Sequence, residues 1–256
     1  MSAIMRHPLV LFVMSFVVMA IGAYIGATVL RRRLKNIDGG RDGLDVVQAA
    51  TLTLLALIIG FTFSMAVTRY DQRKNYEEEE ANAIGTAYLR SGLLPAAEAR
   101  SMKKLLRLYL DLRIRYYQAR SDQAVAQINA ATGQLQNDLW KAAQIAAMEQ
   151  QTAVIALVVS GMNDVLNTQG YTQASWWNHI PITAWSLMIA IGLFSNLLIG
   201  YSLHGNVKGN VVLLVLPLVI ASSFALIADI DSPRGGWITL TPINLIALAH
   251  SLGPAG

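Results

Sequence analysis

The side chains with the greatest chemical potential lie in two short charged segments. In the first, ADIDSPRGG at 228–236, two carboxylates and a guanidinium directly follow an apolar run, and Ser-Pro and Gly-Gly favour a turn. Asp229, Asp231 and Arg234 are therefore candidates for a pore mouth or for the joint that docks an extramembrane domain. A local Asp–Arg pair that stabilises the end of a membrane span is the simpler interpretation.

The second segment is the acidic run 77–80, which follows a basic group containing Arg73. On a continuous helix, Arg73 and Glu77 are an i,i+4 pair worth a few tenths of a kcal/mol, so a solvated, ion-paired helix is the simpler interpretation. If several copies met around an axis, the acids would instead form a cation-attracting ring or a divalent-ion site. The further candidates for a pore mouth or docking joint are Glu79, Glu80 and Asn82.

The apolar run 46–68 places its polar residues on two opposite helical faces. We expect the face with Gly60 and Ser64 to pack in a bundle, because small residues allow close approach of a neighbouring backbone. The other face then needs a partner and could line a water-filled pore, with Phe61 or Phe63 as a hydrophobic constriction. Ordinary packing is the simpler interpretation, since threonine can bond its own helix. The predicted pore-lining residues are Gln48, Thr51, Leu55, Phe61, Thr62 and Ser64.

Catalytic and metal-binding chemistry finds no support in the sequence. The chain has no cysteine, and its four histidines are scattered without metal-ligand spacing. Metalloprotease, nucleophile-elbow, phosphate-loop and dinucleotide motifs are not found. The basic residues of 100–120, including Arg113, are typical of a solvated face. We therefore expect no enzyme activity, no metal and no cofactor, since an intramembrane enzyme would need paired polar groups within its spans.

These segments must be positioned by membrane-spanning helices. The chain is 54% hydrophobic and 14% charged, against about 25% charged residues in soluble domains. A span needs about 20 apolar residues. Four runs satisfy this length, with Trp176 and Trp177 expected as interfacial aromatics before the third and Pro217 inside the fourth. The predicted spans are 9–30, 46–68, 180–203 and 211–228, with loops at 34–45 and 204–210.

About 110 residues between the second and third spans show helical periodicity. Pro95 suits the start of one helix, and Ser121 can cap the next. The apolar run 237–250 is too short to span and contains Pro242, so we place it at the interface or docked on the helical domain. The predicted fold is all-α and comprises two spans at 1–69, an extramembrane helical domain at 70–178, two spans at 179–230 and an interfacial or docked segment at 231–256.

Two blocks of the sequence resemble the bestrophin-like domain family of bacterial and plastid membrane proteins. They are GFTFSMAVTRYDQRKNYEEEEANAIGTAYLRSGLLP at 60–95 and ADIDSPRGG at 228–236. The resemblance implies kinship with bestrophins, which are pentameric chloride channels with four spans, a helical region between spans two and three, and a neck formed by span two. The bestrophin Pro-Phe-Gly sequence and acidic calcium clasp after the fourth span have no match here, so calcium gating is not expected.

Two functions are compatible with these features. The first is a homo-oligomeric, pentameric ion channel in a bacterial inner membrane, whose partners are lipid, inorganic ions and copies of itself. The second is a non-conducting scaffold or sensor that binds a partner through the helical domain. No nucleic-acid motif is present, and the net charge of +4 is carried by short clusters suited to anionic lipid.

The charge pattern gives conflicting signals for orientation. The loop after the first span carries Arg31, Arg32, Arg33, Lys35 and Arg41, and the positive-inside rule weights such short loops heavily. This places the helical domain on the extracytoplasmic side. The basic residues just after the second span, and the bestrophin resemblance, favour a cytoplasmic domain. We expect the extracytoplasmic arrangement, because the loop cluster is denser and directly abuts its span.

Overall fold

The computed structural model describes residues 7–33, 41–202 and 211–253, and within them the chain is helical without a β-strand. Within these ranges, four helical stretches are long and apolar enough to cross a membrane: Pro8–Arg33, Gly43–Leu93, Ala153–Ser202 and Val212–Asp231. Each overlaps one predicted span, so the expected all-helical membrane protein is confirmed over the described residues. Residues 34–40 and 203–210, including Lys35 and His204 of the predicted loops, lie outside them.

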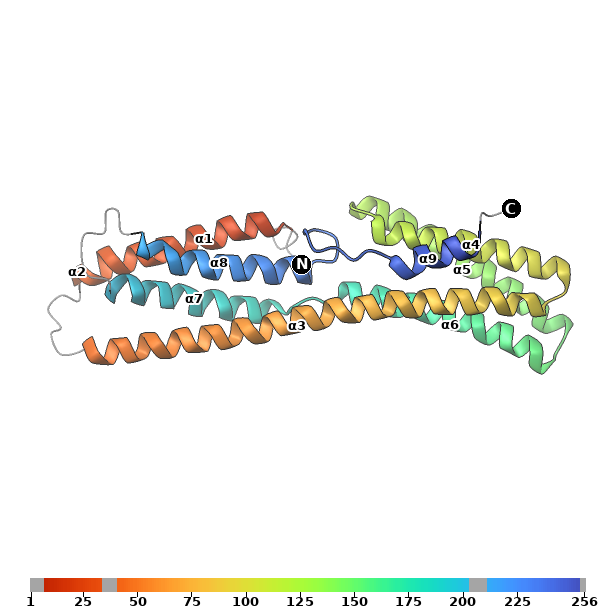
Figure 1. Ribbon diagram of the computed structural model, residues 1–256, viewed down its shortest axis with the longest axis horizontal. Coiled ribbons are helices and arrows are strands. Elements are labelled where there is room, and N and C mark those ends of the chain that lie inside the picture. The colour runs from red at the N-terminus through yellow and green to blue at the C-terminus, as the bar shows by residue number, and fades with distance from the viewer. Residues whose placement is uncertain (1–6, 34–40, 203–210, 254–256) are drawn as a thin grey trace. The chain divides into compact units, whose positions relative to one another are not determined.

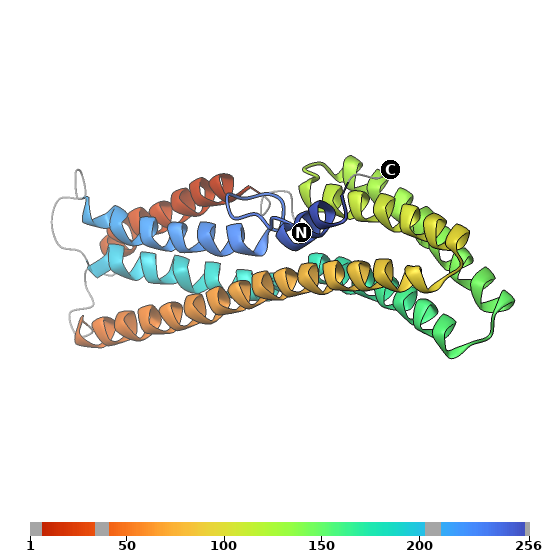
Figure 2. The same cartoon turned by 45° about the vertical axis from the view of Figure 1, so that its right-hand side comes forward.

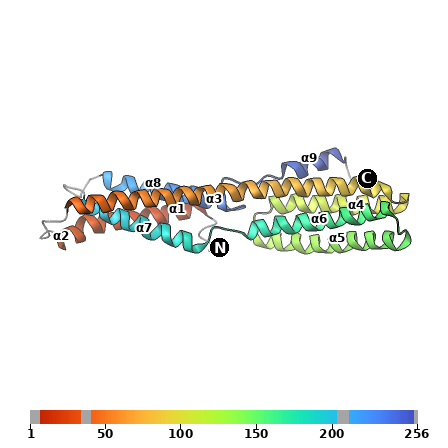
Figure 3. The same cartoon turned by 90° about the horizontal axis from the view of Figure 1, so that it is seen from below.

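The chain divides into two compact units, which we call the membrane unit (1–69 and 179–239) and the helical domain (70–178 and 240–256). Helix α3, Arg41–Arg90, contributes to both. In the membrane unit, α1 (Pro8–Ile25) lies beside α7 (Ile182–Ser202) and α8 (Val212–Asp231) (Figures 1 and 3). A π-helical turn, Gly26–Leu30, follows α1 and leads into the short α2, Arg31–Arg33.

Glycines allow α1 and α7 to approach closely. A Cβ atom on Gly26 would collide with the carbonyl oxygen of Leu197, and one on Gly200 would collide with that of Ala23. Small residues at a helix crossing increase van der Waals contact where the hydrophobic effect between helices is weak. The spacing of Gly22 and Gly26 therefore serves to pack the first span against the third.

The helical domain contains three long antiparallel helices: α4 (Ala96–Gln118), α5 (Asp122–Glu149) and α6 (Ala153–Trp177) (Figures 1 and 3). A 3₁₀ turn, Ser91–Leu93, and the predicted Pro95 precede α4. The predicted cap of α5 is confirmed, since the Ser121 hydroxyl accepts from the N–H of Ala124 at 3.2 Å. The prediction for Trp176 as an interfacial aromatic is wrong, because its ring is buried against Tyr116 and Tyr117.

The domain core is formed by apolar residues of α4, α5 and α6 together with the second half of α3. A short helix, α9 (Ile243–Ser251), adds Leu245 to this core and lies against α4 (Figure 2). The segment 237–250 thus starts in the membrane unit and ends as a helix packed on the helical domain.

Candidate functional site

The centre of the helical domain holds a buried ion pair. Glu80 of α3 and Arg113 of α4 are fully buried and are joined by a hydrogen bond from Nε to Oε1, with Nη2 3.5 Å from Oε2. The second carboxylate oxygen also accepts from the hydroxyls of Tyr117, at 3.3 Å, and Thr172, at 3.1 Å. Three helices therefore converge on one carboxylate.

This arrangement shifts the titration of the surrounding groups. Burial opposes the charge of Arg113, but the adjacent Glu80 carboxylate holds the pKa of Arg113 above its ordinary value. Burial, reinforced by the charge of Glu80, raises the pKa of Tyr117 and of Tyr109. Arg113 stays charged and both phenols stay protonated at neutral pH, so the cluster has the properties of a structural anchor rather than of a proton-transfer site.

The expectation that the charged residues of 73–80 are solvated is wrong for three of them. Arg73, Glu77 and Glu80 are each at most 1% exposed, whereas Glu79 lies on the surface. Arg73 donates to the backbone carbonyls of Ser175, at 3.2 Å, and Asn178, at 3.0 Å. Arg73 therefore makes long-range contacts to the end of α6.

Glu77 holds the N-terminal turn of α9. Its Oε1 accepts from the backbone N–H of Leu245 at 2.9 Å, and its Oε2 accepts from Nδ2 of Asn244 at 2.7 Å. Burial raises the pKa of Glu77, and the hydrogen bonds from α9 partly offset that rise. The acidic run thus contributes one buried acid to the domain core and a second to the docking of the C-terminal segment.

In the membrane unit, Asp229 likewise binds backbone N–H groups with its carboxylate. Its carboxylate accepts from the backbone N–H of Trp237, at 2.7 Å, and of Ile238, at 3.1 Å. A side chain on Gly236 would collide with the same carboxylate. The spacing of Asp229 and Gly236 in ADIDSPRGG is explained by the close approach of Gly236 to this carboxylate. The contact fixes the segment that follows α8.

Asp231, two residues later, links the ends of three spans. Its Oδ2 accepts from the N–H of Ile180 at 3.1 Å, just before α7. Nη1 of Arg69 lies 3.7 Å from Oδ1, and Nδ1 of His179 lies 3.5 Å from Oδ2. Of the expected pore-mouth or docking residues, Asp229 and Asp231 are thus buried anchors, while Arg234 is partly exposed on the segment between them and α9.

The remaining pore-mouth candidates lie apart from these anchors. Glu79 and Asn82 are exposed on the α3 surface of the helical domain, facing away from the buried Glu80. No group of three or more histidine, cysteine or acidic side chains within 7–33, 41–202 and 211–253 is placed to hold a metal ion.

In the membrane unit, part of the α3 face that was expected to line a pore packs within the chain. Leu55 and Thr62 are buried, and Oε1 of Gln48 accepts from the Ser202 hydroxyl of α7 at 2.8 Å. The face predicted to pack is open instead, since a Cβ on Gly60 would meet no atom within 4 Å. Thr51 is half-buried, whereas Phe61 and Ser64 are exposed. The predicted set is therefore divided between the packed and the open side of α3.

The chain was compared with known protein families. The sequence pattern of the Bestrophin-like domain matches residues 14–245, which include both charged segments. This chain belongs to the bestrophin-like domain family. A comparison with curated proteins found no match.

The bestrophin-like chain also resembles solved structures. Two variants of a bacterial bestrophin homologue from Klebsiella pneumoniae align with TM-scores of 0.65 and 0.64, at 12% and 14% identity. The alignments cover 93% and 94% of this chain and 99% and 96% of theirs. A structure described as a membrane protein variant aligns with a TM-score of 0.62 at 12% identity, covering 93% of this chain and 98% of its own. At this identity the likeness concerns the fold.

The sequence did not reveal two residues that contact the buried Glu80 carboxylate, Arg113 and Thr172. The basic residues of α4 predict a solvated Arg113, although this residue continues the apolar stripe of Leu106, Tyr109 and Leu110 at helical spacing. That spacing was the available signal, because an arginine within an apolar stripe must be paired when buried. Thr172 had no comparable signal, since its partner lies 92 residues away.

Proposed function

We propose that this bestrophin-like protein is a homo-oligomeric, pentameric ion channel of the bacterial inner membrane, with a pore lined by the open face of α3. The observation that carries the proposal is the composition of that face. In the most apolar part of the stretch Gly43–Leu93, 17% of the residues are buried within the chain. The corresponding share for α8 is 50%. Lipid alone does not account for polar groups on such a helix, so water or a second copy is the expected neighbour.

The open face has the residues that a pore neck needs. Thr53, Ser64 and Thr68 are exposed along it, with Gly60 between them. Phe61 is 65% exposed beside this polar line, and Leu57 is also exposed. Ring-like repetition of such apolar side chains around an axis would form a constriction that gates by dewetting. Thr53 and Thr68 bond carbonyls of their own helix, which lowers the cost of placing them there.

Cysteine labelling tests the proposed pore face, because the chain has no native cysteine. Ser64→Cys protein in liposomes should lose ion flux when a membrane-impermeant thiol reagent is added. Thr62→Cys is the matched control, since Thr62 is 4% exposed and two residues away. Ion flux at carrier rates, or loss of flux only with Thr62→Cys, would contradict the proposal.

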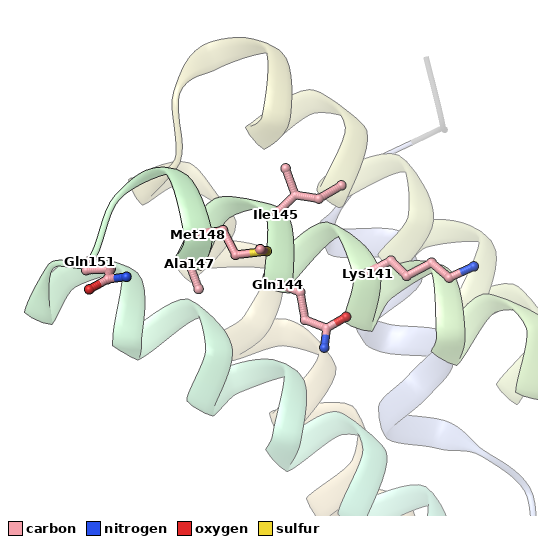
Figure 4. A pocket seen from close by; sticks show the side chains of 6 residues that line it. All are labelled: Lys141, Gln144, Ile145, Ala147, Met148 and Gln151. Carbon is pink, nitrogen blue, oxygen red and sulfur yellow. The ribbon is translucent and has the colours of Figure 1, made fainter.

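A non-conducting scaffold or sensor is the second candidate function. A pocket of about 460 Å³ lies at the end of α5, with Met148 80% exposed and Ile145 also exposed (Figure 4). Exposed apolar side chains beside a hollow are typical of protein–protein contacts. The pocket is lined by Lys141, Gln144, Ile145, Ala147, Met148 and Gln151. A co-purifying protein lost on Met148→Glu substitution, in preparations that pass no ions, would favour this function.

We further propose that the helical domain lies between spans two and three on the extracytoplasmic side, and that the protein is not an enzyme. The basic end of α2 supports the orientation through the positive-inside rule. Reporter fusions after Lys35 and near Gln134 test it. An alkaline phosphatase fusion near Gln134 that stays inactive would reverse the assignment.

A further inference from the structure

Two outer faces of the helical domain carry almost no charge. One of the twelve exposed residues of α6 is charged, Asp164, against four of the nine exposed residues of α4. Exposed on the same helix are Tyr171, at 53%, and Leu157, at 48%. Helix α9, described over its whole length, exposes no acid, lysine or arginine, and its Ile243 is 63% exposed. Depletion of charge together with exposed aromatic and aliphatic side chains is typical of protein–protein interfaces.

These two faces belong to helices that pack on different sides of α3 (Figure 3). On one side, the ring of Tyr171 stacks on Tyr76 of α3 with the centroids 6.0 Å apart. On the other side, Asn244 of α9 binds the next residue of α3, Glu77, at 2.7 Å. Ile243 directly precedes Asn244. Tyr171 and Ile243 therefore lie at about the same height along α3.

The two faces also carry complementary polar groups further along α3. On α6, the carboxylate of Asp164 lies 3.7 Å from Nη1 of Arg90 and is still 55% exposed. On α9, Leu248 lies against Gly85 of α3, and the exposed His250 follows two residues later. Asp164 and His250 thus also lie at similar heights. An imidazole N–H can donate to a carboxylate in either charge state of the histidine.

We propose that the outer face of α6 in one copy packs against the outer face of α9 in the next copy, with Tyr171 against Ile243 and Asp164 paired with His250. This contact rests on the homo-oligomer of the proposed function. A pore lined by α3 sets the symmetry axis roughly parallel to that helix, so residues at one height along α3 meet at the same height in neighbouring copies. Contact between two different faces is head-to-tail, and it generates a ring when the rotation closes.

Disulfide trapping between two tagged forms of the full-length protein tests the contact, because the chain has no native cysteine. Tyr171→Cys and Ile243→Cys, each with its own tag, are co-expressed and oxidised in the membrane. We expect disulfide-linked pairs that carry both tags, which form only between copies. In the control, Lys104→Cys replaces Ile243→Cys and should give at least tenfold fewer pairs, since Lys104 is exposed on α4.

Charge reversal tests the pairing of Asp164 with His250. Asp164→Lys, added to the Tyr171→Cys form, should lower the yield of mixed disulfides at least threefold. His250→Glu, added to the Ile243→Cys form, should restore that yield. Asp164 also contacts Arg90 in its own chain, so the recovery separates contact between copies from a local effect. A yield that stays low in the combined variants would overturn the pairing.

The mass of the wild-type particle in detergent or lipid separates this contact from the proposed function. An oligomer whose mixed variants form no more disulfide than the Lys104→Cys control would overturn the contact while the homo-oligomer stands. Strong disulfide formation in Tyr171→Cys or Ile243→Cys alone would show that equivalent faces meet, and would overturn the head-to-tail arrangement. Mixed disulfides in a protein that passes no ions would refute the channel while the contact stands, and a monomeric particle would refute both.

Discussion

The backbone N–H of Trp237 donates to Oδ1 of Asp229 at 2.7 Å, and this bond ties the segment that follows the fourth span to the end of that span. The same carboxylate accepts from Ile238, so its loss would remove the acceptor of two N–H groups. We expect Asp229→Ala to destabilise the protein by about 1.5–3 kcal/mol, the contribution of hydrogen bonds to a charged group. Asp229→Asn keeps one acceptor oxygen and should cost less. Thermal unfolding in detergent, with proteolysis between Ser232 and Pro242, measures both; equal stability of Asp229→Ala and the wild type would contradict this account.

The ion pair in the helical domain should show strong non-additivity. Breaking a buried pair by removing one partner costs about 3–5 kcal/mol, because an uncompensated charge stays buried. We therefore expect Arg113→Met and Glu80→Leu each to destabilise the domain strongly. The double variant Glu80→Leu/Arg113→Met should cost clearly less than the sum of the two single replacements. Denaturant unfolding followed by circular dichroism tests the cycle, with the exposed Glu79→Gln as control; additive effects would show that the two side chains act independently.

The pH dependence of stability should carry a contribution from Glu77. Burial raises the pKa of this carboxyl in the folded protein, so the folded state binds its proton more tightly than the unfolded state does. The resulting stabilisation is fully present below the ordinary glutamate pKa and is lost as the pH rises through the folded value. Between pH 4.5 and 8, Glu77→Gln should therefore show a smaller decline in unfolding free energy than the wild type. Parallel declines in the two proteins would remove Glu77 as the source.

The helix crossing in the membrane unit should be intolerant of a single methyl group. A Cβ on Gly26 or Gly200 meets backbone atoms that cannot move independently of their helix. Overpacking of this kind costs about 1–3 kcal/mol. Gly26→Ala and Gly200→Ala should lower the yield of folded protein and its melting temperature. Gly60→Ala is the matched control, since its Cβ would meet open space within the chain; the same loss in all three would contradict the crossing as the cause.

Features set by local chemistry were predictable from the sequence. The four spans follow from the length and charge of apolar runs, and the Ser121 cap follows from the residue type before a helix. The partners of Glu77 and Glu80 were not predictable, because both acids are contacted by residues brought close only by the tertiary fold. The acidic run looked uniform, yet position in the helical turn buries two of its members and exposes the other two.

The face of α3 that packs within the chain was not predictable for a related reason. Small polar residues serve two purposes in membrane helices, since they permit close packing and also tolerate water. The pairing of Gln48 with Ser202 identifies the face that packs on α7, and this contact joins positions 154 residues apart. A periodic pattern identifies two faces of a helix, but it does not state which of them meets the rest of the chain.

The cap that α9 takes from Glu77 also constrains the order of events during biosynthesis. Residues 70–178 leave the ribosome before the third and fourth spans, whereas Leu245, which completes their core, follows both. While the third and fourth spans are inserted, the nascent domain must therefore keep two features exposed. They are the carboxylate of Glu77 and the apolar surface that Leu245 later covers. Exposed apolar surface of this kind is what chaperones bind. Translation that stops between Asp231 and Pro242 would leave the domain without α9.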